Sequence, residues 1–334
     1  MANRQIVLKE KPSGKLTPEH FALREVPVPT PGPSEVLTRT VLLSLDAANR
    51  AWMQGRTYTD PVESGDVMHG FTLARVEASD DPGFKPGDLV EAMNGWQDYA
   101  VHKAKALAKV APVRPLSHAM SVLGVTGKTA YFGMLEIGKP KPGETVLVSA
   151  AAGAVGSIAA QIAKMQGARV VGLAGSDAKC QWLARHCGID AAINYKSGAL
   201  PKLLRQHCPN GIDVYFDNVG GDVFEAALFQ MNARGRVVCC GAVSQYDVAT
   251  PTAGPRGVPG LIVVKRLKLE GFIVMDFYSK RAEAERRLAE WVREGRLKVA
   301  EDIVEGLEKA PEALCGLLAG ENLGKRMVRV VPEA

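Results

Sequence analysis

The sequence has 334 residues, of which 46% are hydrophobic, and its 41 Lys and Arg against 36 Asp and Glu give a net charge of +5 at pH 7. This length exceeds what one hydrophobic core usually reaches, so two domains are expected. The charge is mild and scattered, with no basic block interleaved with aromatic residues, so nucleic acid is not expected as a partner.

The cysteines and the N-terminus exclude further classes of protein. All six cysteines lie at or beyond Cys180 and none forms a C-x-x-C pair, so neither a disulfide framework nor a zinc cluster is expected. The N-terminus lacks an apolar signal core, and no run reaches the roughly 18 apolar residues that span a bilayer. We therefore expect a soluble, cytoplasmic protein with no membrane partner.

Residues 1–120 form a β-rich region by pattern. Short strand candidates lie between turns rich in Pro and Gly, at 6–8, 21–25, 36–45, 73–77, 89–92 and 99–102. Many short strands separated by such turns are typical of a barrel or a sandwich.

Beyond residue 120, strands alternate with helices. A helical pattern at 119–137 precedes strands that are predicted at 145–149, 169–173, 191–194, 213–217, 236–240 and 269–272. Helices are predicted at 155–166, 178–187, 198–207, 223–231 and 280–298. This alternation indicates a parallel sheet covered on both faces, the doubly wound nucleotide-binding arrangement. Because the apolar run 327–331 is expected to return to the first region, the predicted domains are 1–121 completed by 299–334, and 122–298.

The sharpest local motif is the small-residue turn 151–156, which resembles G-x-G-x-x-G with Ala151 in place of the first glycine. Gly153 would let the backbone approach a pyrophosphate, and Gly156 would let the helix pack tightly on its strand. The helix N-terminus then offers unpaired N–H groups to the phosphates. A strand–helix turn that binds nothing is the alternative.

The end of the second strand of this region favours NADP(H) over NAD(H). It ends at 174–175 without the carboxylate that holds the ribose 2′-hydroxyl in NAD-binding folds. Ser176 and Lys179 follow, and a hydroxyl and an ammonium suit a 2′-phosphate. Asp177 is interpreted as the N-cap of the next helix, and a plain surface lysine is the alternative reading of Lys179.

No metal is expected in the active site. The first 179 residues hold no cysteine, and His69 is isolated, so a thiolate-ligated catalytic zinc is excluded there. An enone is already polarised by its own conjugation. Hydride can therefore go to its β-carbon, and a hydroxyl donor such as a tyrosine can stabilise the enolate oxygen.

Several motifs occur in one order along the chain, at 43–46, 61–62, 67–68, 150–157, 172–177, 194–196, 215–221, 240–246 and 320–325. With them the chain resembles, over essentially its whole length, the metal-free alkenal/one oxidoreductase branch of the medium-chain dehydrogenase/reductase superfamily. That branch includes the leukotriene B4 12-hydroxydehydrogenase/15-oxoprostaglandin 13-reductases and bacterial curcumin reductases. The resemblance implies an α/β protein with a Rossmann-type doubly wound parallel sheet and a GroES-like, partly open β-barrel domain.

The resemblance also implies NADPH/NADP+ as the cofactor and assigns residues to it. The pyrophosphate would be held by Gly153, Ala154, Val155 and Gly156, and the 2′-phosphate by Lys179 and Tyr195 beside Ser176. The other implied cofactor contacts are Asn218, Cys240, Gly241, Ala242, Ser244, Tyr246, Phe272, Val274 and Asn322. From the residues alone, Asn218 could equally be a turn asparagine, Cys240 a packing residue and Tyr246 a surface aromatic.

Two tyrosines are candidates for the enolate donor, Tyr58 and Tyr246. Near Tyr58 the chain departs from its relatives, many of which carry Pro and Tyr where this sequence has Ala47 and Ala48. Any role of that second tyrosine is therefore absent here. Trp96 lies in a variable loop and would either line the pocket or pack.

These observations predict an enzyme that uses NADPH to reduce the carbon–carbon double bond of a small-molecule α,β-unsaturated ketone or aldehyde. A homodimer is expected, because the last strand of the parallel sheet can pair with its two-fold mate. An NADPH quinone reductase and a non-catalytic NADPH-binding sensor are the alternatives that remain.

Overall fold

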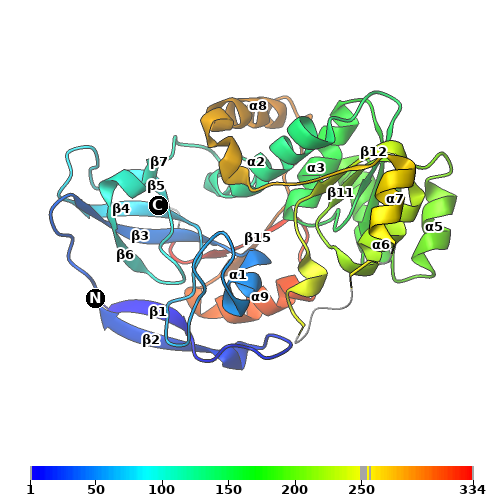
Figure 1. Cartoon of the computed structure of the whole chain (residues 1–334). Coiled ribbons are helices and arrows are strands. Elements are labelled where there is room, and N and C mark those ends of the chain that lie inside the picture. Colours follow the sequence, from blue (N-terminus) through cyan, green and yellow to red (C-terminus); the bar gives the residue numbers. More distant parts are fainter. Residues whose placement is uncertain (1, 249–253, 256, 333–334) are drawn as a thin grey trace.

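The computed structural model of the chain describes residues 2–248, 254–255 and 257–332. Two sheets dominate it, one on each side of the molecule (Figure 1). The first is built mainly from the N-terminal third, and its strands and helix are β3 (Glu35–Ser44), α1 (Ala48–Gln54), β4 (Thr72–Ser79), β5 (Leu89–Ala92), β6 (Tyr99–Lys103) and β7 (Ala108–Lys109). A separate hairpin joins β1 (Ala2–Leu8) to β2 (Phe21–Pro27).

The C-terminal tail completes this first sheet. It contains β14 (Glu301–Glu305), α9 (Ala310–Leu318) and β15 (Lys325–Arg329). The seven-stranded order is β14-β15-β3-β4-β5-β7, with β6 paired to β3. Since β15 runs antiparallel to β3, with Met327 opposite Ser44, the last strand lies against one of the first.

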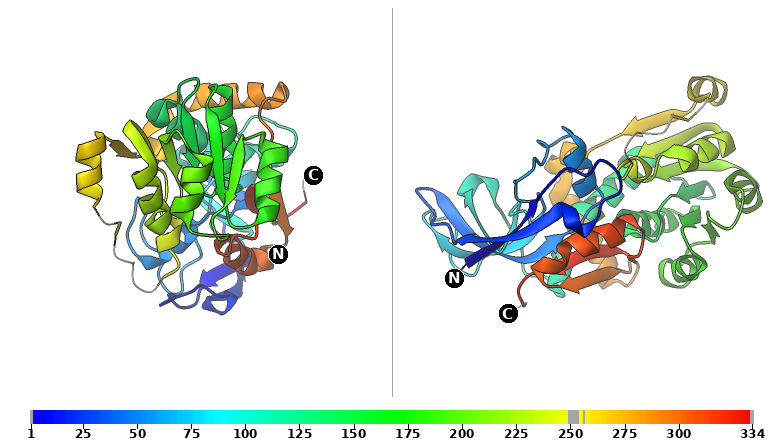
Figure 2. Two further views of the ribbon diagram at one scale, coloured as in Figure 1. Left: turned by 90° about the vertical axis from the view of Figure 1, so that its right-hand side faces the viewer. Right: turned by 90° about the horizontal axis from the view of Figure 1, so that it is seen from below.

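The second sheet has six strands in the order β10-β9-β8-β11-β12-β13, and every neighbouring pair is parallel. Its strands are β8 (Thr145–Val148), β9 (Arg169–Ala174), β10 (Ala191–Asn194), β11 (Ile212–Asp217), β12 (Met231–Cys239) and β13 (Lys268–Gly271). Its helices are α2 (Val125–Phe132), α3 (Ala154–Met165), α4 (Asp177–Trp182), α5 (Leu200–His207), α6 (Gly221–Gln230), α7 (Val258–Lys265) and α8 (Arg281–Arg293). Figure 2 shows these helices on both faces of the sheet.

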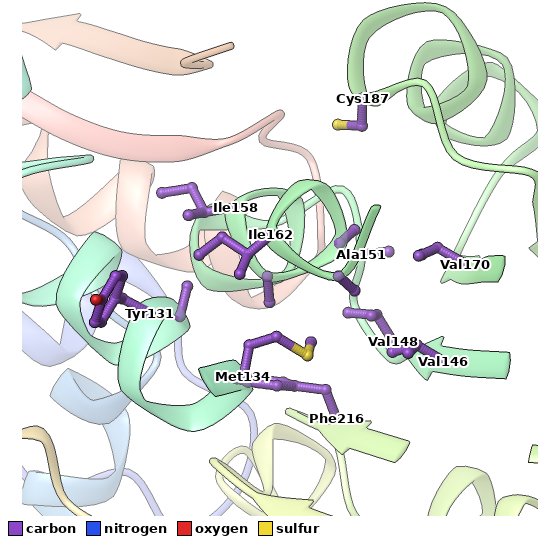
Figure 3. Close-up of a cluster of buried hydrophobic side chains, with 14 of the residues drawn as sticks. Tyr131, Met134, Val146, Val148, Ala151, Ile158, Ile162, Val170, Cys187 and Phe216 are labelled. Atoms are coloured by element: carbon purple, nitrogen blue, oxygen red, sulfur yellow. The ribbon is translucent and has the colours of Figure 1, made fainter. Parts of the chain in front are cut away.

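Alternating side chains on the central strands explain this layering. Val146 and Val148 on β8 pack toward the cluster of α2, α3 and α8, which also holds Phe216 (Figure 3). Leu147 between them points to the opposite cluster, with Tyr215. Because successive strand residues face opposite sides, a continuous apolar run serves two cores. The fold class expected from the sequence, a Rossmann-type sheet beside a GroES-like β-barrel, is confirmed.

Some elements differ from the predictions. The helix expected over 119–137 is shorter, because Gly124 is the extended N-cap of α2 and a π-helical turn, Gly133–Gly138, follows it. Cys240 lies just outside β12, which ends at Cys239. The sequence did not predict α1, α7 or α9. Other short helical turns are Pro18–His20, Ala104–Ala106, Leu116–Ala119, Leu183–Cys187, Val243–Gln245, Val274–Lys280 and Leu307–Lys309.

Within the described residues, no helix combines the length and apolarity that crossing a membrane requires.

Candidate functional site

The turn between β8 and α3 is shaped by glycine. A Cβ on Gly156 would overlap the carbonyl oxygen of Ala150, so the helix can start this close to the strand only with glycine. At Gly153, the extended N-cap, an added Cβ would approach only that same oxygen, at 3.1 Å. The first N–H groups of α3, including those of Ala154 and Val155, have no acceptor within the helix. A bare backbone with free N–H donors fits a pyrophosphate.

The hydroxyl and the ammonium predicted for the 2′-phosphate lie together after β9. Ser176 accepts a hydrogen bond from the Lys179 backbone N–H at 3.3 Å, so it is the N-cap of α4. The prediction that Asp177 is the N-cap is wrong: the cap needs extended backbone, which Ser176 has, and Asp177 is already the first helical residue. The Tyr195 hydroxyl lies 3.4 Å from the position that a Cβ on Gly175 would take.

Lys179 also links the parallel sheet to the C-terminal tail. Its ammonium donates to the carbonyl oxygens of Gly320 at 2.6 Å and Asn322 at 2.7 Å. Burial lowers its pKa from the ordinary lysine value, with smaller contributions from neighbouring positive charges. The buried Asn322 side chain donates to Gly324, whose N–H donates to the Ala152 carbonyl at 2.9 Å. The tail is thereby held against the glycine turn.

A buried carboxylate that sequence reasoning missed shapes the end of β11. Asp217 is 3% exposed and accepts hydrogen bonds from the Tyr215 hydroxyl at 2.6 Å, from Ser149 at 3.1 Å, and from two backbone N–H groups of the following turn. Asn218 donates its side-chain amide to the Ser149 carbonyl at 2.7 Å. In the sequence, the Asp-Asn pair at the end of an apolar strand could have indicated this carboxylate. These bonds fix Asn218 at the carboxyl edge of the sheet, where such folds bind ligands.

The segment that follows β12, residues 240–246, lies at the same carboxyl edge of the parallel sheet. Cys240 donates its N–H to the Asp217 carbonyl at 2.9 Å, and the Ser244 hydroxyl donates to Val219 at 2.6 Å. The Ala242 N–H donates to the Tyr246 hydroxyl at 3.2 Å, and a Cβ on Gly241 would lie 3.7 Å from that hydroxyl. Burial raises the pKa of the Cys240 thiol to about 12, which suits a packing residue rather than a nucleophile.

Phe272 and Val274 occupy different surroundings after β13. The Phe272 ring packs on Phe277 with centroids 6.1 Å apart, and its edge would lie 2.8 Å from a Cβ on Gly133. Val274 is 6% exposed and belongs to the core around α2 and α3. Of this pair, Phe272 is the more accessible to a ligand.

On the barrel side, Tyr58 packs edge-on against buried Trp52, with ring centroids 6.2 Å apart. Tyr58 is 47% exposed, and its partial burial and then the Asp46 carboxylate raise its pKa to about 12, with smaller contributions from Tyr246 and Cys240. Trp96, by contrast, is fully buried and stacks on Phe21, so it packs rather than lines the site.

An ion pair that sequence reasoning missed lies between the C-terminal tail and the segment before α1. Lys325 is 2% exposed and donates to Asp46 at 2.6 Å and to the Leu45 carbonyl at 2.9 Å. The pair joins β15 to the segment that leads into α1. No sequence signal distinguished Lys325 from a surface lysine.

Among the described residues, no three His, Cys, Asp or Glu side chains come together as a metal site. His69 lies near Trp52, with ring centroids 6.3 Å apart, and its buried Nδ1 atom has no hydrogen-bond partner among the described residues.

The barrel contains a separate hollow of about 340 Å³, which shares no lining residue with the site. The residues that line it include Asn3, Gln5, Asn94, Gln97 and His102.

The chain is similar to known oxidoreductases along almost its whole length. Residues 4–110 match the model described as the N-terminal domain of oxidoreductase, and residues 154–293 match the model described as zinc-binding dehydrogenase. The NADPH-dependent curcumin reductase of Escherichia coli (strain K12) is 42% identical, covering 98% of this chain and 97% of that protein. Prostaglandin reductase 1 of Bos taurus is 42% identical over 96% of this chain and 97% of its own length.

A solved structure gives the same similarity in three dimensions. The crystal structure of CurA from Vibrio vulnificus in complex with NADPH is 41% identical in sequence and has a TM-score of 0.94. The match covers 99% of this chain and 100% of that one.

Proposed function

The chain belongs to the medium-chain dehydrogenase/reductase superfamily, in its alkenal/one oxidoreductase family, and we propose that it uses NADPH to reduce the carbon–carbon double bond of α,β-unsaturated ketones and aldehydes. The observation that carries this proposal is the glycine turn Gly153–Gly156, whose bare backbone fits a pyrophosphate. The Ser176 hydroxyl and the Lys179 ammonium follow it, where a 2′-phosphate would lie. Relatives named for NADPH-dependent reduction support it.

The cofactor residues divide into three tasks. The turn Gly153–Gly156 binds the pyrophosphate through backbone N–H groups. Ser176, Lys179 and Tyr195 bind the 2′-phosphate and discriminate against NADH. The remaining contacts flank the nicotinamide half, and they are Asn218, Cys240, Gly241, Ala242, Ser244, Tyr246, Phe272, Val274 and Asn322.

The reaction needs one hydride and one proton. NADPH, when bound, supplies the hydride, which the β-carbon of the substrate accepts. The electron pair of the double bond moves toward the carbonyl oxygen, and a hydroxyl of Tyr58 or Tyr246 donates a hydrogen bond to the resulting enolate. A proton from solvent, or through that hydroxyl, reaches the α-carbon and gives the saturated carbonyl product. No metal is required, since the substrate's own conjugation delocalises the charge.

The proposal also includes the domain boundaries, the assembly and the cellular location of the protein. We infer that the domains are 1–121 completed by 299–334, and 122–298, with the reaction in the cleft between them. The chain forms a homodimer through β13, an edge strand of the parallel sheet. It works in the cytoplasm, where the six cysteines, all of them free, stay reduced.

A substrate panel tests the proposed function directly. NADPH oxidation is followed at 340 nm, the usual NADPH absorbance band, with trans-2-alkenals, enones and quinones, and each assay is repeated with NADH. We expect turnover of enones and alkenals with NADPH preferred by about tenfold or more in kcat/KM, the size of one charge-assisted contact. Quinone turnover without enone turnover would favour a quinone reductase. NADPH binding without any turnover would favour a sensor.

A further inference from the structure

Arg50 is a buried charge that the reaction described above does not use. It lies on α1, beside the barrel sheet, and is 1% exposed. Its Nη2 donates to the carbonyl oxygen of Gly14 at 2.8 Å, and its Nε pairs with the Asp247 carboxylate at 3.0 Å. A buried guanidinium is costly unless it is paired, so this contact constrains both partners.

Asp247 follows Tyr246 immediately, in the segment that leaves the parallel sheet after β12. This segment approaches α1 and α9 (Figure 1). The same carboxylate oxygen accepts the Leu16 N–H at 2.8 Å, and Gln54, also on α1, donates to the Tyr246 carbonyl at 2.8 Å. The barrel thus holds Asp247 and the Tyr246 backbone through three separate groups.

The start of the same segment is bonded to the parallel sheet through its backbone. Val243 and Ser244 donate their N–H groups to the carbonyl oxygens of Asn218 and Val219, at 3.2 Å and 3.1 Å. The Tyr246 hydroxyl accepts the N–H of Ala242, four residues earlier in this segment, at 3.2 Å. Tyr246 therefore belongs to a segment whose start is bonded to the parallel sheet and whose end is bonded to the barrel.

We propose that the Arg50–Asp247 ion pair, together with the Gln54–Tyr246 hydrogen bond, is an interdomain clamp that positions Tyr246 toward the substrate. This inference rests on the proposed function. Arg50 and Asp247 are positioning residues, because they act on the reaction only through Tyr246. Substrate turnover is thereby coupled to the contact between the two sheets, whereas the 2′-phosphate contacts at Ser176 and Lys179 stay independent of it.

The test is a double-mutant cycle that combines Asp247→Ala with Tyr246→Phe. We expect Asp247→Ala to lower kcat with an enone by about tenfold, while the preference for NADPH over NADH, which Ser176 and Lys179 set, stays within about twofold. In the Tyr246→Phe background, Asp247→Ala should cost nothing further, because the positioned hydroxyl is already gone. An equal loss in both backgrounds, or no loss in the single variant, would overturn the clamp.

Two additional variants keep stability from confusing the result. Asp247→Ala leaves the Arg50 charge buried without its carboxylate partner, which destabilises the protein. The double variant Arg50→Met/Asp247→Asn removes both charges. Its melting temperature should be higher than that of Asp247→Ala, whereas its kcat should stay as low. Asp98→Asn is the matched control, since it breaks the Arg4–Asp98 pair elsewhere in the barrel. Its kcat should equal that of the wild type. A low kcat in this control would show that any broken ion pair impairs turnover and would refute the specific role.

Hydrogen exchange separates this inference from the proposed function. Amides of residues 242–248 should exchange faster in Asp247→Ala than in the wild type, with or without an enone substrate. If the wild type reduces no enone, the proposed function fails, and the exchange rates still decide whether the clamp holds this segment. Unchanged exchange would refute the clamp even in an active enzyme.

Discussion

Lys179 is the residue to which we propose that the preference for NADPH is most directly due. Its ammonium is oriented by two tail carbonyls and stands one helical turn from the Ser176 cap. Lys179→Ala should therefore raise the KM for NADPH by about tenfold to a hundredfold, the worth of a charge-assisted hydrogen bond. Kinetics with NADH should be nearly unchanged. Equal losses with both cofactors would show that the substitution disrupts the tail instead.

The same residue gives a pH dependence whose sign follows from its environment. Because burial lowers the pKa of Lys179, its ammonium loses its proton at a lower pH than an ordinary lysine does. The KM for NADPH should rise as alkaline pH removes this proton, while the KM for NADH stays level. A parallel rise for both cofactors would point to a different group.

Replacement of Tyr58 or Tyr246 by phenylalanine shows which of the two hydroxyls stabilises the enolate. Whichever hydroxyl stabilises the enolate, its Phe variant should lose at least about tenfold in kcat, or about 1.4 kcal/mol of barrier. If kcat falls in neither variant, the enolate has no essential tyrosine donor. The pKa of Tyr58, raised to about 12, keeps its proton in place. A Tyr58 donor should consequently give no alkaline decline in kcat below about pH 10, the ordinary tyrosine pKa.

At the scale of elements, the turn between β8 and α3 offers two glycines with different constraints. An added Cβ on Gly156 would overlap the Ala150 carbonyl, so Gly156→Ala should cost about 1–3 kcal/mol of stability as well as cofactor affinity. An added Cβ on Gly153 meets only that oxygen, at 3.1 Å, so Gly153→Ala should keep its melting temperature near that of the wild type. It should still weaken NADPH binding, because the methyl group would lie where the backbone approaches the phosphates.

Calorimetry and NADPH titration on both variants measure these effects. An undiminished NADPH affinity in Gly153→Ala would mean that the phosphates do not approach this backbone.

Elements with strong periodicity could be predicted from the sequence, and those set by tertiary packing could not. The apolar runs of β8, β9 and β11, with a small-residue turn after β8, are local signals. By contrast, α7 is apolar up to its last residue, Lys265, so no amphipathic stripe marks it as a helix. Lys325 was missed because its partners, Asp46 and the Leu45 carbonyl, are distant in the sequence, and nothing local distinguishes a buried lysine from a surface one. Asp217 was missed although the Asp-Asn pair at the end of an apolar strand was a local signal, and most of its partners lie within three residues of it.

For the whole molecule, we propose that a second copy binds at the exposed end of the parallel sheet. Val263 and Val264 on α7 are 74% and 69% exposed, Phe229 on α6 is 56% exposed, and β13 forms the edge beside them. Burying these apolar groups and the open strand edge in a two-fold contact would stabilise a dimer.

Sedimentation equilibrium should accordingly give a mass about twice the 35.7 kDa of one chain. Val263→Lys/Val264→Lys should shift this mass toward the monomer. Leu23→Lys, which alters a comparably exposed residue of the barrel hairpin, should leave it unchanged. A monomeric wild type would contradict the proposed assembly without touching the active site.

The central claim is that this chain delivers hydride from NADPH to the β-carbon of an enone, and isotope transfer tests it most directly. NADPH carrying deuterium at C4 of the nicotinamide is incubated with the enzyme and a simple enone, and the product is analysed by NMR. The product should be a saturated ketone with deuterium at the β-carbon and a solvent-derived hydrogen at the α-carbon. An allylic alcohol with deuterium at its carbinol carbon, or no transfer with any enone or alkenal, would contradict the claim.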